Sequence, residues 1–145
     1  MRKFPKYEYP IKLNIGCGKD DRKGFINIDF RDLGFNMIWD IRGGIPFPDG
    51  SVDEIFASHF VEHLDDEECQ DFFVDAMRVL KPHGGLLVVR CPHFQSVGAF
   101  YMGHKSFWNT ARVEALTRFD KDLGLFVITE NKIDREELHF TIRKS

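Results

Sequence analysis

The chain has 145 residues, of which 43% are hydrophobic and 30% are charged, and its formal net charge at pH 7 is -3. This balance is that of a folded globular protein, and the length fits one domain spanning residues 1–145. The negative net charge argues against a protein that binds nucleic acid through broad phosphate contacts. The three cysteines form no C-x-x-C pair and no even-numbered disulfide set, and no apolar stretch has the length of a membrane span. We therefore expect a soluble, cytoplasmic protein with reduced thiols.

The first half of the chain is predicted to contain short strands separated by turns. Short apolar runs lie between Gly- and Pro-rich segments, as strands bounded by turns do. The first run stops at Gly16 and Gly18, where a tight turn is expected. The turn sequence Pro-Phe-Pro-Asp-Gly at residues 46–50 precedes the last run. The predicted strands are 11–15, 25–30, 37–41 and 52–58.

The clearest predicted element is a helix that begins near Asp65 and Asp66, which are N-cap candidates and place negative charge in the first turn. Lys81-Pro82 and the glycines that follow end it. Apolar residues recur along it with the i, i+3, i+4, i+7 spacing of one buried face. They are Cys69, Phe72, Phe73, Ala76, Met77 and Leu80.

The next segment is predicted to be a strand followed by an aromatic loop. Residues 86–91 are apolar up to Arg90, which predicts a central strand of a parallel sheet with both faces covered. A loop rich in aromatic residues runs from Pro92 to Gly103, and a weaker helix is predicted at 109–117.

The chain is predicted to end in an antiparallel hairpin. The apolar runs 125–133 and 138–143 flank Asp-Arg-Glu-Glu, which fits a four-residue connection. Strands separated by helices and followed by a hairpin predict an α/β fold with a single doubly wound, mostly parallel sheet and a C-terminal antiparallel hairpin.

The glycines after the first strand and Asp29 at the end of the second suit a nucleoside ligand. Gly16 and Gly18 let the backbone pass close to a ligand, and an acidic side chain at the end of the next strand accepts hydrogen bonds from both ribose hydroxyls. A dinucleotide site would need G-x-G-x-x-G, but the residue three after Gly18 is Asp21. The pair Asp20-Asp21 repels phosphate, whereas a cofactor with a positively charged sulfonium tolerates it.

These motifs resemble the class I S-adenosylmethionine-dependent methyltransferases, and within them a compact methyltransferase-like group. The similar stretches cover most of positions 11–92 and have the order and spacing of that family. They are 13–29, 40–42 with 45–53, 57–64 and 78–85. The resemblance implies a Rossmann-like fold, S-adenosylmethionine as the cofactor and methyltransferase activity.

The resemblance also implies a role for each residue of the cofactor site. The set comprises Gly16, Cys17 and Gly18 toward the methionine moiety, Asn14 toward its ammonium group, Asp29 and Phe30 at the ribose end of the second strand, Asp40 and Ile41 toward the adenine, and Ser58 and His59 on the floor. Family members often carry an acidic residue where Asn14 stands, so that contact is expected to be uncharged.

The connection between the first two strands is short for this fold. Only residues 19–24 separate the glycine turn from the second strand, whereas a parallel crossover normally takes a dozen residues or more. The first helix is therefore predicted to be reduced or missing.

Two histidines are candidate catalytic bases. His93 and His104 bracket the aromatic loop after strand 86–91, at the edge where open α/β sheets bind ligands. A packed surface loop is the alternative. Cys17 has no paired base and is interpreted as an uncharged filler. Cys91, His93 and His104 lack the tight ligand pairs of a zinc site, so no metal site is predicted. Glu62 with His63 fits a functional role or a capping role equally.

The sequence therefore predicts methyl transfer from S-adenosylmethionine to an oxygen, nitrogen or carbon atom of a small-molecule acceptor. The segment 58–61 lacks the Asn/Asp-Pro-Pro-aromatic pattern of amino-group base methylases, which argues by analogy against nucleobase amines. Two alternatives are a domain that binds the cofactor without turnover and an RNA-modifying accessory protein. Neither nucleic acid nor membrane is expected as a partner. Because the chain has no insertion to cover an acceptor site, a homodimer is expected to supply the missing wall.

Overall fold

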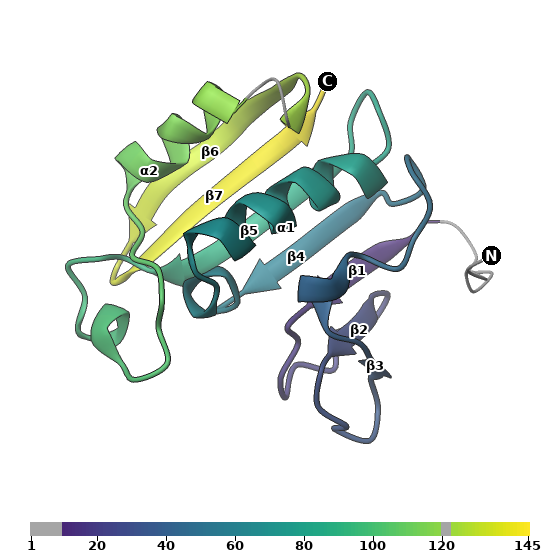
Figure 1. Cartoon of the computed structure of the whole chain (residues 1–145), viewed down its shortest axis with the longest axis horizontal. Helices are drawn as coiled ribbons and strands as arrows, with labels where there is room; N and C mark the ends of the chain where they lie inside the picture. The colour runs from purple at the N-terminus through teal and green to yellow at the C-terminus, as the bar shows by residue number, and fades with distance from the viewer. Residues whose placement is uncertain (1–9, 120–122) are drawn as a thin grey trace.

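A computed structural model describes residues 10–119 and 123–145, and its strands form one sheet in the order β3-β2-β1-β4-β5-β7-β6 (Figure 1). Strands β1 to β5 run parallel to one another, and β7 is antiparallel to both β5 and β6. The strands are β1 (Lys12–Ile15), β2 (Ile26–Asp29), β3 (Met37–Ile38), β4 (Glu54–Ser58), β5 (Leu86–Pro92), β6 (Phe126–Asp134) and β7 (Glu137–Lys144). The predicted mostly parallel α/β sheet with a C-terminal antiparallel hairpin is confirmed.

The longest helix, α1 (Asp66–Val79), begins as its sequence predicts. Asp65 is the N-cap and accepts a hydrogen bond from the Glu68 backbone, while the Glu68 side chain accepts one from the Asp65 backbone. This capping box satisfies two otherwise unpaired N–H groups at the start of the helix. The shorter helices are α2 (Thr110–Glu114) and the 3₁₀ helices η1 (Ile41–Gly43), η2 (Val61–His63), η3 (Val97–Phe100) and η4 (Ala115–Phe119). None of the helices in the described ranges is long and apolar enough to cross a membrane.

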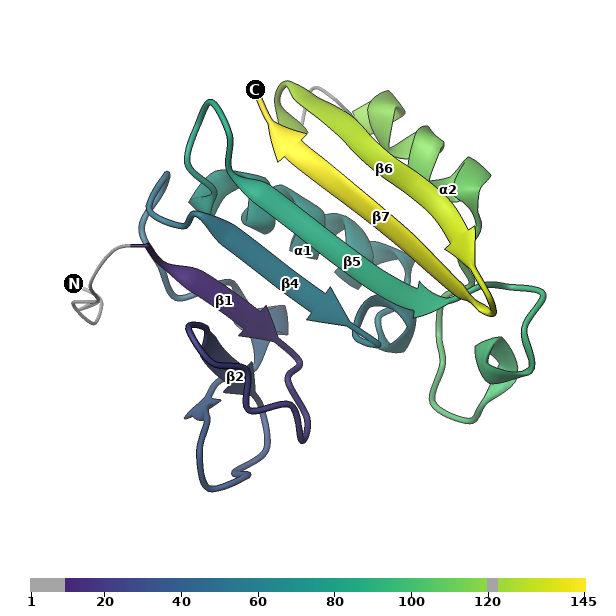
Figure 2. The same cartoon turned by 180° about the vertical axis from the view of Figure 1, so that it is seen from behind.

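Helices α1 and α2 lie on the same face of the sheet. In Figure 1, α1 crosses in front of β4 and β5 and α2 lies in front of β6, whereas the view from behind in Figure 2 shows the strands in front of both helices. Along β5, Leu87, Val89 and Cys91 are fully buried in the core with α1, while Arg90 is exposed. The expectation that both faces of this central strand are covered is therefore wrong. The apolar run reflects half-burial of the other face, not a second helical layer.

Part of the helix-free face is covered by arginine side chains stacked on an aromatic ring. Phe56 of β4 is buried, with the Arg22 guanidinium carbon 3.8 Å and the Arg90 guanidinium carbon 5.5 Å from its ring centroid. A guanidinium over an aromatic face is attracted by the ring and keeps its own hydration. Arg22 comes from the connection between β1 and β2, which contains turns and no helix. The predicted reduction of the first helix is thus confirmed, and Arg22 covers part of the surface left open.

Aromatic rings fill the core between α1 and the hairpin. Trp108 is 1% exposed, and its ring stacks on Phe140 of β7 with centroids 5.6 Å apart. Phe73 of α1 contacts both rings, at 5.8 and 6.2 Å. These rings join the segment before α2 to the helix and to β7, and so fix where the preceding loop lies.

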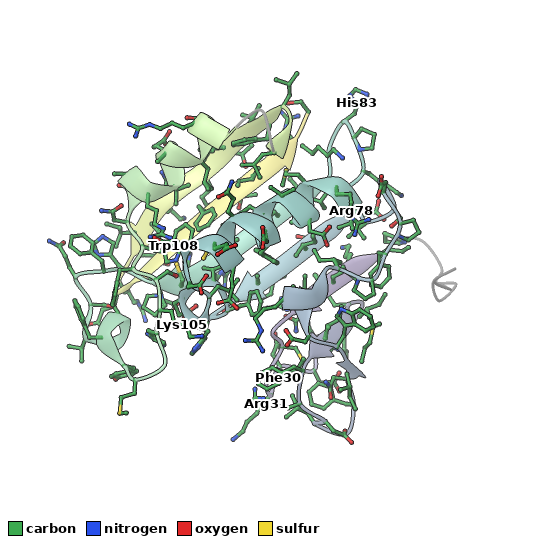
Figure 3. The ribbon with its side chains drawn as sticks, viewed as in Figure 1. Phe30, Arg31, Arg78, His83, Lys105 and Trp108 are labelled. Carbon is green, nitrogen blue, oxygen red and sulfur yellow. The ribbon has the colours of Figure 1, made fainter. Side chains whose placement is uncertain are left out.

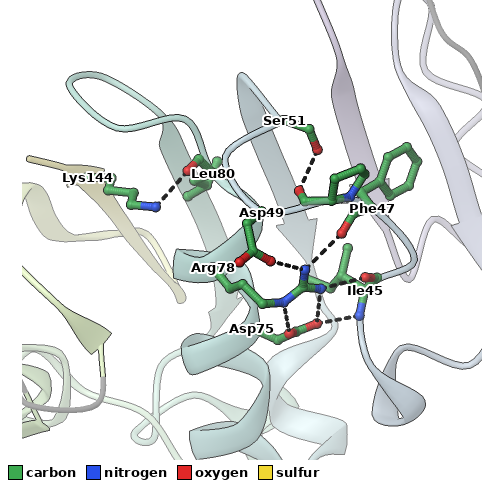
Figure 4. Close-up of polar contacts among 9 residues, drawn as sticks. Ile45, Phe47, Asp49, Ser51, Asp75, Arg78, Leu80 and Lys144 are labelled. Atoms are coloured by element: carbon green, nitrogen blue, oxygen red, sulfur yellow. Dashed lines mark hydrogen bonds and ion pairs between the residues drawn. The ribbon is translucent and has the colours of Figure 1, made fainter. Parts of the chain in front are cut away.

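Arg78 ties the connection between η1 and β4 to α1 (Figure 4). Its guanidinium donates to the Ile45 and Phe47 carbonyls at 2.8 and 2.9 Å and pairs with Asp49 and Asp75 at 2.8 and 2.6 Å. Asp75 in turn accepts a hydrogen bond from the Ile45 backbone. Arg78 therefore fixes a segment whose apolar side chains, at residues 45 and 47, are buried in the core.

Two predicted boundaries are corrected. The hairpin connection has two residues instead of four, because Asp134 and Glu137 pair with each other and Arg135 turns the chain with a φ of 59°. The third strand has two residues instead of the predicted 37–41, and the chain then enters η1, whose N-cap is Asp40.

Candidate functional site

A cavity of about 430 Å³ opens at the carboxyl ends of β1, β2 and β4. The sheet order reverses here, since β2 pairs with one side of β1 and β4 with the other. Open α/β sheets bind ligands at such a point, and a cavity of this size can hold a nucleoside-sized molecule. Its walls come from three chain segments and the glycine turn. The lining residues are Gly16, Ile28, Asp29, Phe30, Arg31, Trp39, Asp40, Ile41, Arg42, His59, Phe60, His63 and Leu64.

The glycine turn is shaped by two positive φ angles. Gly16 has a φ of 63°, and a Cβ at this position would lie 2.5 Å from the Phe60 ring. Gly18 has a φ of 53°, and its backbone N–H donates to the Asp29 carboxylate at 3.0 Å. Glycine adopts these angles at little cost, and only glycine fits against Phe60. At Gly16 the cavity wall therefore consists of backbone, with no side chain pointing into the cavity.

Asp29 ends β2 with its carboxylate buried at the base of the cavity, 4% exposed. Gly18 N and Arg31 Nη2 donate to its Oδ2 at 3.0 and 3.2 Å, and Arg31 N and Nε donate to its Oδ1 at 3.0 and 3.1 Å. Burial alone would raise the pKa of Asp29, but these hydrogen bonds and the Arg31 charge outweigh it and lower the pKa. The group is therefore an anion at neutral pH.

The opposite wall of the cavity is partly apolar. Ile41 is buried, and Phe30 is 64% exposed beside the opening. Figure 3 shows Phe30 and Arg31 at one edge of the molecule and His83 at the opposite edge. Asp40 caps η1 and pairs with Arg42 at 2.8 Å, and this contact lowers the pKa of Asp40 despite some burial. A cavity lined by apolar side chains together with two ionised carboxylates suits a flat heterocycle with polar edges.

His59 follows β4 in a left-handed conformation, with a φ of 53°. A residue other than glycine in this region is strained, and such strain gathers at functional sites. Its Nε2 lies 2.9 Å from Glu137 Oε2, and its Nδ1 lies 3.4 Å from Glu62 Oε2. The contact with Glu62, followed by that with Glu137, raises the pKa of His59. The side chain thus links the cavity wall to the start of β7.

Six of the ten predicted cofactor residues line this cavity, and four lie behind it. The lining set is Gly16, Asp29, Phe30, Asp40, Ile41 and His59. The Asn14 amide donates to Asn27 at 2.9 Å and to the Asp20 carbonyl at 3.0 Å, so it shapes the turn. Cys17 is buried, and burial together with the Asp29 charge raises its pKa to about 11. Gly18 acts through its bond to Asp29, and Ser58 ends β4 opposite Arg90. Contact with a cofactor remains a prediction for all ten.

The two candidate bases lie in different surroundings. His93 is 7% exposed, forms a bridge with Trp108, and is not part of the cavity wall. His104 is half-buried, and its ring packs against that of His63, which lines the cavity, with centroids 4.8 Å apart. A catalytic role remains a prediction for both, and the geometry favours His104.

Sequence reasoning missed several residues of the cavity wall. They are Ile28, Arg31, Trp39, Arg42, Phe60, His63 and Leu64. Each is within five positions of a predicted residue, because the ends of β2, β3 and β4 and the turns after them form the walls. That clustering at strand ends was the available signal.

A family model described as "Methyltransferase domain" matches residues 26–88 of the chain. Two curated relatives are the highly reducing polyketide synthases resH of Aspergillus sclerotiorum and rstn3 of Aspergillus nomiae, 27% and 28% identical over 105 residues. These alignments cover 71% of this chain but only 4% of each synthase.

Solved structures share the fold at low sequence identity. A SAM-dependent methyltransferase from Archaeoglobus fulgidus is 19% identical with a TM-score of 0.69, and the match covers 93% of this chain and 86% of that one. The 1,6-didemethyltoxoflavin-N1-methyltransferase of Burkholderia thailandensis, solved with 1,6-didemethyltoxoflavin and S-adenosylhomocysteine, is 14% identical with a TM-score of 0.68, covering 94% and 72%. A SAM-dependent methyltransferase from Aquifex aeolicus has a TM-score of 0.65 at 16% identity, covering 94% and 82%.

Proposed function

We propose, on the premise that this chain belongs to the class I S-adenosylmethionine-dependent methyltransferases, that it transfers the methyl group of S-adenosylmethionine to a small-molecule acceptor. The observation that carries the proposal is the cavity at the switch point of the sheet, with Gly16 on one side and the Asp29 carboxylate at its base. The chain spans about 4% of the length of its curated relatives, so their activities are not transferred to it.

The residues of the cavity fit this cofactor. Gly16 lines the cavity with backbone alone, and packing against the Phe60 ring excludes a larger residue at this position. Asp29 is ionised, and both of its oxygens could accept hydrogen bonds from a ribose diol once the Arg31 guanidinium moves away. The apolar Ile41 and Phe30 suit an adenine ring, and the acidic surroundings suit a cation. The phosphate-binding turn of dinucleotide proteins is absent from the described segment after Gly18.

When bound, the cofactor supplies an electrophilic methyl group, and the protein's part is to bind, orient and exclude water. Asp29 and Ile41 would hold the nucleoside end, and the glycine turn would hold the methionine end. The acceptor would lie beside His59 and His63, which line the same cavity. The exposed rings of Phe100, Tyr101 and Phe107 stand on the loop above η2 and would cover it.

The acceptor is proposed to be small because the described chain carries no broad basic surface beside the cavity. Arg31 and Arg42 line the opening, but each is paired with an aspartate. The B. thailandensis enzyme with the same fold was solved with a small heterocyclic compound bound. A small acceptor is thus within the capacity of the fold.

Calorimetric titration with S-adenosylhomocysteine tests the cofactor site, with a nicotinamide dinucleotide as the control ligand. We expect saturable binding of the first and none of the second; the reverse result would refute the assignment. Incubation with methyl-labelled S-adenosylmethionine and a cell extract, followed by separation of small molecules, RNA and protein, tests the acceptor. Label in the small-molecule fraction is expected. Label confined to RNA would favour the RNA-modifying alternative, and binding without any transfer would favour a non-catalytic domain.

A further inference from the structure

Beside the cavity, η2 and the loop before α2 are fastened together by hydrogen bonds. The backbone N–H groups of Lys105 and Ser106 both donate to the Glu62 carbonyl, at 2.7 and 3.2 Å. The Ser106 hydroxyl donates to the Val61 carbonyl at 2.9 Å. Residue 104 is therefore held next to residues 62 and 63, although 41 positions separate residue 63 from it in the sequence.

Glu62 is a buried carboxylate without a hydrogen-bond donor. Its side chain is 2% exposed, and neither Oε1 nor Oε2 has a hydrogen-bond partner among the described residues. The nearest cationic group is His59, whose Nδ1 is 3.4 Å from Oε2 without hydrogen-bond geometry. Burying a carboxylate with so little compensation is costly unless a further cation or donor completes it. His59 is the one cationic contact among the described residues, and neither carboxylate oxygen receives a hydrogen bond, so Glu62 can accept a further cation or donor.

Two imidazoles supply the other side of the same space. One ligand atom each from Glu62, His63 and His104 lie within 4.8 Å of one another. The His104 Nδ1 faces the Ala99 carbonyl at 3.2 Å, which fixes a proton on Nδ1 and leaves Nε2 free to bind a metal. A backbone carbonyl on the second ring nitrogen is the usual support for a metal-binding histidine.

We propose that Glu62, His63 and His104 form a binding site for one divalent transition-metal ion of the Zn²⁺ class. Two imidazoles and one carboxylate are a ligand set that such ions accept, and it leaves a coordination position open. Ligands that share a Zn²⁺ ion lie roughly 3–3.5 Å apart, so these side chains, whose ligand atoms lie within 4.8 Å of one another, would have to close in slightly around the ion.

The open position would face the cavity, because His63 lines its wall. If the proposed methyl transfer holds, an acceptor oxygen or nitrogen on the ion would lie beside the methyl donor. This role for the ion rests on the proposed function, whereas the ion site itself does not. The sequence argued against a metal site because its candidate ligands are not closely spaced. In the folded chain, hydrogen bonds to η2 bring residue 104 next to residues 62 and 63.

The test is a titration of the full chain, stripped with chelator, with Zn²⁺ by calorimetry and with Co²⁺ by its visible absorption. One equivalent should bind, and the melting temperature should rise with the metal. Glu62→Gln, His63→Ala and His104→Ala should each weaken binding more than about 100-fold, beyond the loss expected from an outer partner. His83→Asn is the matched control, since His83 is exposed in the loop between α1 and β5, far from Lys105 in Figure 3, and asparagine tolerates its φ of 62°.

No saturable binding by the unmodified chain, or equal affinity in all three variants, would overturn the site. His63 is exposed, so His63→Ala should fold even if the buried Glu62→Gln does not. Binding of S-adenosylhomocysteine is measured on the same preparations. Cofactor binding without metal binding would refute only the proposed metal site. Metal binding without cofactor binding would refute only the proposed function.

Discussion

The Arg31 side chain occupies positions on Asp29 that a ribose diol would need. The carboxylate accepts four hydrogen bonds, two on each oxygen, and the Arg31 guanidinium makes one on each. A carboxylate has about four acceptor sites, so all are in use. The other two bonds come from the Gly18 and Arg31 backbones and shape the cavity. A bound nucleoside must therefore displace the guanidinium, whose side chain is 58% exposed and can move into solvent.

Replacing Arg31 by alanine removes this competitor, so Arg31→Ala should tighten the binding of S-adenosylhomocysteine. Ion pairs with an exposed partner are worth roughly 0.2–1 kcal/mol, which corresponds to a decrease in Kd of up to about fivefold. Because salt screens an exposed pair, the difference between the two proteins should shrink as ionic strength rises. Calorimetric titrations at low and high salt measure both effects.

Arg22→Ala is the matched control. Arg22 also pairs with the aspartate two positions before it, at the same 3.1 Å from Nε, but it does not line the cavity. Its replacement should leave the Kd unchanged, with a melting curve to show the fold intact. Weaker binding by Arg31→Ala would refute the argument, because it would mean that Arg31 contacts the ligand instead of competing with it.

Four further predictions follow from the contacts described above. Gly18→Ala should cost roughly 1–2 kcal/mol of folding free energy through its positive φ alone, and Gly16→Ala a further ~1–3 kcal/mol because its Cβ meets Phe60; equal losses in chemical denaturation would contradict the second contact. Cys17, with a pKa of about 11, should be alkylated by iodoacetamide far more slowly at pH 8 in the folded than in the unfolded chain, and its rate should climb with pH; rapid folded-state labelling by mass spectrometry would argue against the buried thiol. Arg78→Lys should lower the melting temperature by several degrees, since lysine cannot serve two carbonyls and two carboxylates together, whereas Lys23→Arg at an exposed site should not; an unchanged transition would show that the network adds nothing. In the metal-free protein, where Nε2 of His104 is free to accept a proton, His104→Asn should reduce methyl transfer by about 10²- to 10⁴-fold with S-adenosylhomocysteine affinity preserved, and His93→Asn should reduce it less; the opposite order would restore His93 as the base.

The mostly parallel sheet with its C-terminal hairpin, the capped helix and the shortened first connection could all be predicted because each depends on local signals. Apolar runs end at Gly16 and at Asp29, Asp65 is followed three residues later by Glu68, and the connection between β1 and β2 is too short for a helix. The one-sided sheet could not be predicted from β5, because a continuous apolar run is also produced when one face is fully buried and the other half-buried. Arg22 over Phe56 is a contact between distant positions that no spacing rule reveals.

The residues of the cavity follow strand ends, whereas those of the proposed metal site lie far apart in the sequence, and this explains why the first group was predicted and the second was not. Parallel strands bring their carboxyl ends to one edge, so Gly16, Asp29 and Asp40 could be grouped from strand ends alone. The expected homodimer has no such signal in the sequence, and a measurement of the mass in solution tests it.

Glu62 and His104 lie close together because the backbone N–H groups of residues 105 and 106 both donate to the Glu62 carbonyl. The packing of Trp108 on Phe140 also helps to position this loop. Backbone hydrogen bonds of this kind leave no trace in residue type. The structure points to this ligand set through one feature, the buried Glu62 carboxylate that has no hydrogen-bond donor. The Zn²⁺ titration tests whether a metal ion binds to that carboxylate.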